Sequence, residues 1–162
     1  MKKKLKSPRQ SKVVMTEMVL PQHTNALGGV FGGVIMSWID IAAAICAQRH
    51  SGRTCVTASI DDLHFLNPVK EGMVVNIDAQ ITCVNTTSCE ILVTIGGENP
   101  FMGEKFKVAS AYLTFVSLDS NGHPASMPGL KVSSEKEKKL LKEAKIRRNN
   151  RFRLKKKLKE SQ

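Results

Sequence analysis

Alternation of apolar and polar residues predicts five β-strands and one long apolar helix. The strands are expected at 12–20, 54–65, 73–84, 89–95 and 106–118, with Val56, Ala58 and Ile60 on one face of the second. Short connections between the later strands favour antiparallel pairing. The last strand is the longest and is partly apolar on both faces, which indicates a central position in the sheet.

The helix is expected at 34–49, because this stretch has no Gly or Pro and two Gly-Gly pairs precede it. A helical projection divides its residues by size. Large side chains lie on one side (Val34, Ile35, Trp38, Ile41, Ile45), and small ones lie on the other with Asp40 among them (Gly33, Ser37, Ala43, Ala44, Ala47). Such a helix is expected to be buried. We predict an α+β fold, in which an antiparallel five-stranded sheet wraps around this helix and a second copy covers the open sheet edge.

Asp40 is the one charged residue inside the helix. A buried carboxylate is costly unless it is paired, so Asp40 is either a satisfied structural group or a group that serves chemistry. The glycines upstream favour chemistry, since they let a ligand approach the N–H groups at a helix start. A membrane span over 26–47 is the alternative, and Asp40 together with four glycines argues against it.

The net charge of +11 is concentrated at the two ends of the chain. We divide the chain into a basic N-terminal segment (1–12), a mildly acidic domain (13–132) and a basic C-terminal tail (133–162). Basic tails alone do not indicate a nucleic-acid-binding domain, and no nucleic-acid partner is expected. A capping box at Ser134 and Glu137 predicts a solvated helix in the tail. An acidic membrane surface is the alternative partner for this helix.

The four cysteines and four histidines do not form a recognisable ligand pattern. Cys46, Cys55, Cys83 and Cys89 lie in apolar contexts without CxxC spacing, so we expect small core residues, no disulfide framework and no metal site. This cysteine usage fits a reducing cytoplasm. The N-terminal residues lack the apolar region of a secretory signal.

Two motifs match a known family. The stretch N-A-L-G-G-V-F-G-G-V-I-M-S-W-I-D (25–40), followed by V-T-A-S-I-D-D-L-H-F-L-N-P-V (56–69), resembles the hot-dog acyl-CoA thioesterases of the YciA and brain acyl-CoA hydrolase type. The similarity extends from about Val13 to Leu130. It implies hydrolysis of a fatty acyl-CoA thioester in a homodimer whose sheets join edge to edge, and often in a trimer of such dimers.

The resemblance also implies roles for particular residues. Asn25 and Asp40 correspond to the family's catalytic pair. Asp40 would act as general base on a water, with a role as nucleophile as the alternative, and Asn25 would orient the water or the thioester from the partner subunit. Backbone N–H groups near Gly28 or Gly33 would stabilise the oxyanion. The same comparison places Thr57, Ser59, Thr87 and Ser88 along the coenzyme A (CoA) groove. CoA enters as part of the substrate, and no other cofactor is expected.

One departure from the family pattern concerns the CoA phosphates. Family members often have V-G-R-T-S where this chain has V-N-T-T-S (84–88), so a phosphate contact made by that Arg must come from elsewhere, with Arg53, Lys105, Lys107 or the tail as candidates. A hot-dog dehydratase, an acyl-CoA-binding regulator, and a membrane or nucleic-acid binding module acting through the tail are the alternative functions. A dehydratase should place a catalytic His beside its acid, and the helix has no His on the side of Asp40.

Overall fold

The structure is a computed structural model that describes residues 4–161. One five-stranded antiparallel sheet forms its centre, with strands in the spatial order β2, β4, β5, β6, β3. These strands are β2 (Val13–Met18), β3 (Cys55–Phe65), β4 (Val74–Val84), β5 (Ser88–Glu98) and β6 (Lys105–Ser117). The predicted antiparallel sheet is confirmed, and β6 lies inside it between β5 and β3.

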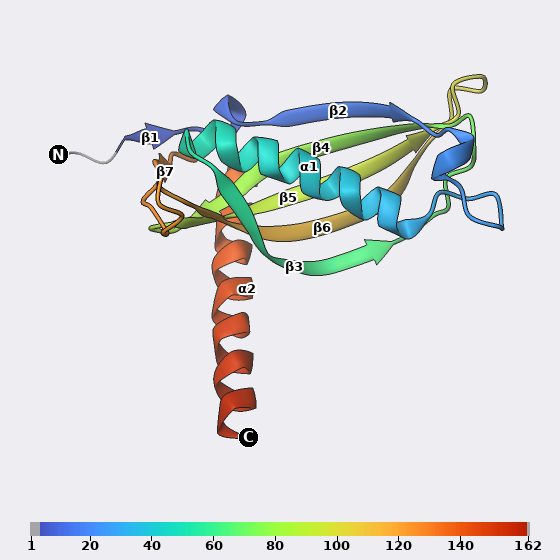
Figure 1. Cartoon of the computed structure of the whole chain (residues 1–162). Coiled ribbons are helices and arrows are strands. Elements are labelled where there is room, and N and C mark those ends of the chain that lie inside the picture. The colour runs from blue at the N-terminus through green and yellow to red at the C-terminus, as the bar shows by residue number, and fades with distance from the viewer. Residues whose placement is uncertain (1–3, 162) are drawn as a thin grey trace.

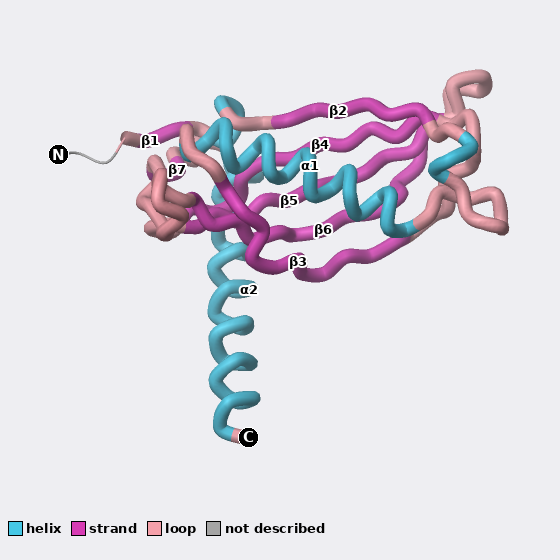
Figure 2. Tube along the Cα trace, viewed as in Figure 1, coloured by secondary structure: helices cyan, strands magenta, loops and turns pink. Residues whose placement is uncertain are grey.

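Helix α1 (Gly32–Ser51) lies across one face of the sheet, which curves around it (Figures 1 and 2). Gly52 ends the helix in the left-handed conformation, with φ of 70°. The core lies between α1 and the inward-facing side chains of the strands, mainly Ile35, Ile39, Ala42, Cys46, Ile77, Ile91, Val93, Leu113 and Phe115. Burial of these apolar side chains is the main stabilising contribution to the fold.

The expected division of the helix into a large and a small side is wrong. Ile41 is 47% exposed, whereas Ala43 and Ala47 are fully buried against the sheet. The helix is also not buried all round, because Met36, Ser37 and Ile41 face outwards in the single chain. Small residues therefore let the helix approach the sheet, and the outward side remains open for a partner.

Residues before β2 pack on the same domain. Strand β1 (Leu5–Lys6) pairs in parallel with β7 (Gly129–Leu130), and a short 3-10 helix, η1 (Pro8–Gln10), follows. The Lys6 ammonium donates to the carbonyls of Arg49 and His50 at 2.8 Å each, where the α1 macrodipole is negative. A second 3-10 helix, η2 (Pro21–His23), opens the loop into α1.

Helix α2 (Glu135–Glu160) crosses the opposite face of the sheet and passes beyond β3 (Figure 1). The predicted capping box is present: the Ser134 hydroxyl accepts from the N–H of Glu137, and Glu137 accepts from the N–H of Ser134. The backbone N–H groups of Ser133 and Ser134 both donate to the Glu137 carboxylate, and they lower its pKa.

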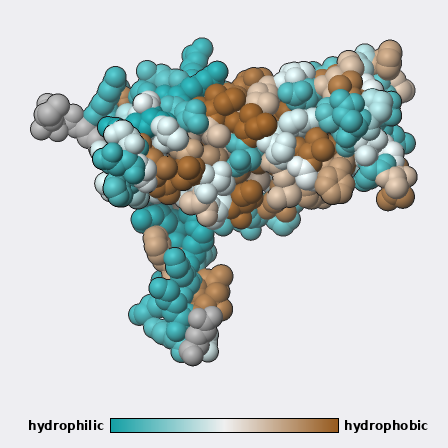
Figure 3. Space-filling view, in the orientation of Figure 1, coloured by the Kyte–Doolittle hydropathy of each residue, from teal (hydrophilic) through white to brown (hydrophobic). Residues whose placement is uncertain are grey.

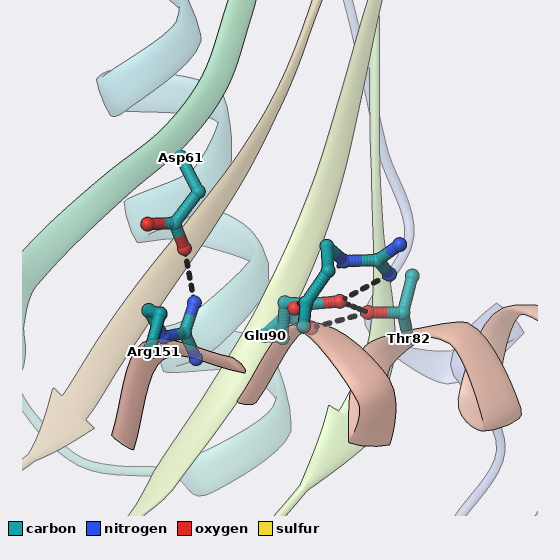
Figure 4. A network of polar contacts seen from close by, with 5 residues as sticks. Asp61, Thr82, Glu90 and Arg151 are labelled. Atoms are coloured by element: carbon teal, nitrogen blue, oxygen red, sulfur yellow. Dashed lines mark hydrogen bonds and ion pairs between the residues drawn. The ribbon is translucent and has the colours of Figure 1, made fainter. Parts of the chain in front are cut away.

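The expectation of a solvated tail helix is wrong for the first half of α2. Arg147 forms an ion pair with Glu90, whose side chain is 4% exposed, and the Arg147 guanidinium lies 3.6 Å from the centroid of the Tyr112 ring. Thr82 also donates to Glu90, and Arg151 pairs with Asp61 on β3 (Figure 4). These contacts dock the helix on β4, β5, β6 and β3.

All four cysteines are buried, as expected of small core residues, and each is a free thiol. Burial raises the pKa of Cys46 to about 12 and raises that of Cys89 well above its ordinary value. Neither of the two α-helices within residues 4–161 combines the length and apolar composition needed to cross a membrane.

Candidate active site

Asp40 lies on the outward side of α1 and is half-buried. Its Oδ1 accepts a hydrogen bond from the hydroxyl of Thr57 at 2.6 Å. A hydroxyl donating to a carboxylate over this distance forms a strong, charge-assisted bond that fixes the orientation of the carboxylate. The second oxygen, Oδ2, has no hydrogen-bond donor within the described chain, so it is available to accept a proton from a bound water.

Thr57 reaches Asp40 because β3 carries an irregularity directly after it. The pairing register of β3 with β6 shifts between Thr57 and Ser59. Thr57 pairs with Phe115 on the core side, whereas Ser59 pairs with Thr114 on the opposite face. Ala58 is the extra residue, so this β-bulge places neighbouring residues of one edge strand on both faces of the sheet.

Asn25 lies in the loop between η2 and α1, where it is exposed. Its side-chain oxygen accepts from the N–H of Leu27 at 2.9 Å and of Gly29 at 3.3 Å, an Asx-turn that orders the loop. The side-chain NH2 has no hydrogen-bond acceptor within residues 4–161 and can donate to a ligand. Within one chain, Asn25 makes no hydrogen bond to Asp40.

The two glycines expected near the oxyanion differ in what their N–H groups do. The N–H of Gly28 donates to the carbonyl of Asn25 at 2.9 Å, and φ is 75° there, so Gly28 serves the turn. Gly33 is in the first turn of α1, where N–H groups have no intrahelical acceptor. A side chain at Gly33 would approach the Phe31 ring to 2.8 Å. Of the two glycines, Gly33 is therefore the better candidate for an oxyanion donor.

One chain does not bring Gly33 and Asp40 together. They are seven residues apart on α1, about 10 Å along the helix axis. On α1, Asp40 lies on the same side as the exposed Met36 and next to the exposed Ile41, and its bond to Thr57 places it beside edge strand β3, whose exposed Ile60 is on the same face of the sheet as Thr57. Figure 3 shows apolar patches on this face of the molecule. The site is thus open on the side where β3 has no strand partner.

The residues expected along the CoA groove divide between the two faces of the sheet. Thr57 faces α1, whereas Ser59 and Ser88 line a cavity of about 780 Å³ between the other face of the sheet and α2. Thr87 lies in the turn before β5, where its carbonyl accepts from the N–H of Ser117 at 2.9 Å. Sequence reasoning did not identify the α2 residues that line this cavity, and only the basic composition of the tail could have indicated them.

A cysteine nucleophile is disfavoured at this cavity. Cys83 lies in its wall, and burial raises the pKa of its thiol, to which the nearby Glu90 carboxylate contributes. Because the thiolate is the reactive form of cysteine, Cys83 is unreactive at neutral pH. The half-buried carboxylate of the open site, Asp40, is the stronger candidate for chemistry.

Comparison with known proteins identifies the family. A family model described as the Thioesterase superfamily matches residues 27–99. The uncharacterized acyl-CoA thioester hydrolase YkhA of Bacillus subtilis is 42% identical over 129 residues, which are 80% of this chain and 75% of that protein. The cytosolic acyl coenzyme A thioester hydrolase of Rattus norvegicus is 35% identical over 82% of this chain, which spans only 35% of that longer protein.

Solved structures agree with this result. An acyl-CoA hydrolase from Staphylococcus aureus in complex with butyryl coenzyme A, coenzyme A and coenzyme A disulfide is 36% identical, with a TM-score of 0.88 over 97% of this chain and 96% of that one. An apo-hexameric acyl-CoA thioesterase is 33% identical, with a TM-score of 0.90 over 93% of this chain and 96% of that one. This chain therefore belongs to the thioesterase superfamily, and its sheet and central helix form the hot-dog fold.

Three further structures of the Staphylococcus aureus enzyme carry alanine substitutions, of an aspartate, an asparagine and a threonine. The residue numbers of these three positions have the same spacing as Asn25, Asp40 and Thr57 in this chain. The three substituted positions thus correspond in type and spacing to the residues singled out above.

Proposed function

We propose that this protein is an acyl-CoA thioester hydrolase that releases a free fatty acid and CoA. The observation that carries the proposal is the bond from Thr57 to Asp40, which holds one carboxylate at the open side of α1. The names of its relatives support the same activity. Four buried free cysteines fit a reducing compartment, and we place the enzyme in the cytoplasm.

Asp40 acts as general base in this mechanism. Its free oxygen takes a proton from water as the water oxygen attacks the thioester carbonyl, and the carbonyl oxygen becomes an oxyanion. First-turn N–H groups at Gly33 stabilise that charge. Collapse of the tetrahedral intermediate breaks the carbon–sulfur bond, and the proton held by Asp40 passes to the leaving CoA thiolate.

A second copy of the chain completes the site. Asn25 and Gly33 lie near the N-terminal end of α1, and Asp40 lies near its middle. In a two-fold dimer, Asp40 of one subunit would therefore act together with Asn25 and Gly33 of the other subunit. Pairing of the β3 edges would bury the exposed apolar residues around Asp40 and remove an open edge. A trimer of such dimers is the assembly we expect, in agreement with two hexameric thioesterases of similar structure.

The test is the Asp40→Asn variant, assayed for thiol release on a panel of acyl-CoAs. Asparagine keeps the acceptor for Thr57 but cannot take a proton, so kcat is expected to fall by about 10² to 10⁴ with the oligomer and CoA affinity preserved. Asp78→Asn is the matched control, because Asp78 pairs with Lys12 on the opposite face of the sheet. Normal turnover by well-folded Asp40→Asn would end this proposal, and CoA binding without turnover by the unmodified protein would indicate a regulator.

A further inference from the structure

The loop that carries Asn25 is a small hairpin whose first residue is His23. Three nested backbone pairs form the hairpin: His23 with Phe31, Thr24 with Val30, and Asn25 with Gly29. The outer pair is a hydrogen bond of 2.8 Å from the N–H of Phe31, the residue before α1, to the carbonyl of His23. Asn25 is two residues from His23 on the same strand of the hairpin, so the position of Asn25 depends on that of His23.

The side chain of His23 makes two contacts outside the hairpin. Its Nδ1 accepts from the N–H of Leu20 at 3.2 Å, and this bond closes η2. A backbone N–H can only donate, so the proton of the neutral ring is on Nε2. The ring also meets the indole ring of Trp38, with the ring centroids 5.2 Å apart and the planes at 87°. This edge-to-face arrangement is one that aromatic pairs favour.

Trp38 is a fixed point on α1. Its side chain is 7% exposed and belongs to the hydrophobic core, where close packing leaves a side chain little freedom. Trp38 lies between Gly33 and Asp40 along the helix, and the hairpin lies at the N-terminal end of the same helix (Figure 1). The contact between His23 and Trp38 therefore sets the position of the hairpin relative to the helix that carries the other two residues of the proposed mechanism.

Asn25 depends on such an anchor because residues 25–28 are all exposed and have little packing of their own. The far strand of the hairpin pairs with the segment at 69–70, whereas the near strand, which carries Asn25, contacts α1 through the His23 ring. Exposed segments with few contacts open easily. A misplacement of about 1 Å at a positioning group can cost about a hundredfold in rate, so the anchor of Asn25 matters for turnover.

We propose that His23 is a positioning residue, which fixes the Asn25 amide in place through its side-chain contacts with Leu20 and Trp38. This inference rests on the proposed hydrolase function, because that function gives the Asn25 amide its task of orienting the water or the thioester. His23 acts through Asn25 and takes no proton in the reaction. In the two-fold dimer, each His23 holds the Asn25 that serves the partner subunit's Asp40.

The experiment is a double-mutant cycle of His23 with Asn25, measured as thiol release at enzyme concentrations high enough to follow residual turnover. His23→Ala removes both side-chain contacts and is expected to lower kcat roughly tenfold, with KM changed less than about twofold. In the Asn25→Ala background it should have no further effect on kcat, because the amide that it would misplace is gone. His123→Ala is the matched control, since His123 is exposed in a turn. If the effects of His23→Ala and Asn25→Ala on kcat multiply, the assignment is overturned.

Two conservative variants separate the two contacts of the ring. His23→Asn offers an amide oxygen in place of Nδ1, and His23→Phe keeps an aromatic ring against Trp38, so each should recover part of the kcat that His23→Ala loses. Trp38 is the only tryptophan of the chain, so its fluorescence reports the ring contact. The emission should change in His23→Ala and His23→Asn and change less in His23→Phe. If His23→Ala does not fold, the cycle with Asn25→Ala is run with His23→Phe.

Hydrogen exchange separates this inference from the proposed activity. The N–H groups of Leu27 and Gly29 donate to the Asn25 oxygen, so their exchange rates report the position of that side chain. His23→Ala is expected to speed exchange at both amides about tenfold and to leave the amide of Cys46 on α1 unchanged. If the unmodified protein hydrolyses no acyl-CoA but both amides respond to His23→Ala, the hydrolase proposal fails and the positioning role holds. Unchanged exchange at both amides would overturn the positioning role.

Discussion

Thr57 is the residue whose role the sequence alone did not give. Alternation along 54–65 predicts Val56, Ala58 and Ile60 on one face, which would leave Thr57 on the other. In the structure the bulge at Ala58 interrupts the alternation, so that Thr57 and Ile60 share the core face and Val56 faces outwards. Asp40 could be identified as a lone charge in an apolar helix, but its partner could not, because a bulge has no signature in the alternation.

Removing the Thr57 hydroxyl should impair catalysis without harming the fold. Thr57→Val has nearly the same shape but leaves Asp40 without its donor, so kcat is expected to fall roughly tenfold as the carboxylate loses its fixed orientation. Thr57→Ser retains a hydroxyl and should keep most of the activity. Steady-state kinetics on both variants, with melting temperatures, provide the measurement. Equal kcat values for the Thr57→Val and Thr57→Ser variants would mean that the bond to Asp40 does not affect the reaction.

The sequence predicted helix α2, but it did not predict where this helix packs on the sheet. The capping box at Ser134 and Glu137 gave its start. Its partners are Glu90 on β5 and Asp61 on β3, far away in the sequence, and a basic helix contains nothing that identifies which carboxylates it will meet.

The ion pair between Arg147 and Glu90 should hold α2 on the sheet. Arg147→Met leaves a nearly buried carboxylate without its cation, with only the Thr82 hydroxyl as donor, and should lower the free energy of unfolding by about 3 kcal/mol. Arg153→Met removes the same charge from an exposed position and should change the free energy of unfolding little. Urea denaturation gives both values. Equal stability of the two variants would show that this contact does not dock the helix.

His50 joins three segments at the end of α1. Its ring is fully buried, with Nδ1 3.2 Å from the Ser11 hydroxyl and Nε2 3.1 Å from the carbonyl of Pro128. A carbonyl only accepts, so Nε2 carries the proton and Nδ1 accepts from Ser11. Burial lowers the pKa of His50 below its ordinary value of 6.5.

The free energy of unfolding should therefore decrease as pH falls below about 6.5, since the unfolded chain binds a proton there that the folded chain does not. Between pH 7 and pH 5 the melting temperature is expected to fall, and His50→Gln should reduce that dependence. His123→Gln is the control, because His123 is exposed in a turn. An unchanged pH dependence in His50→Gln would assign the acid sensitivity to other groups.

One chain forms the complete hot-dog fold, but it leaves the candidate active site open on one side. Strand order could not be read from the sequence, because β3 follows α1 directly but pairs with β6 and so lies at the edge of the sheet. That position puts Thr57, Asp40 and several exposed apolar side chains at the only long unpaired edge near the helix within the described chain. A two-fold partner at this edge would bring its Asn25 towards Asp40.

Mixing two inactive variants tests whether the site is shared between subunits. Asn25→Ala and Asp40→Asn each damage both sites of a homodimer. A heterodimer of the two has one site with both original residues and one with neither, so a random mixture in equal amounts should recover about a quarter of the original activity. Coexpression with two purification tags isolates the heterodimer, in which half of the sites should be active. The site would lie within one chain if the purified heterodimer were no more active than its parents, because each chain would then still carry one substitution in its own site.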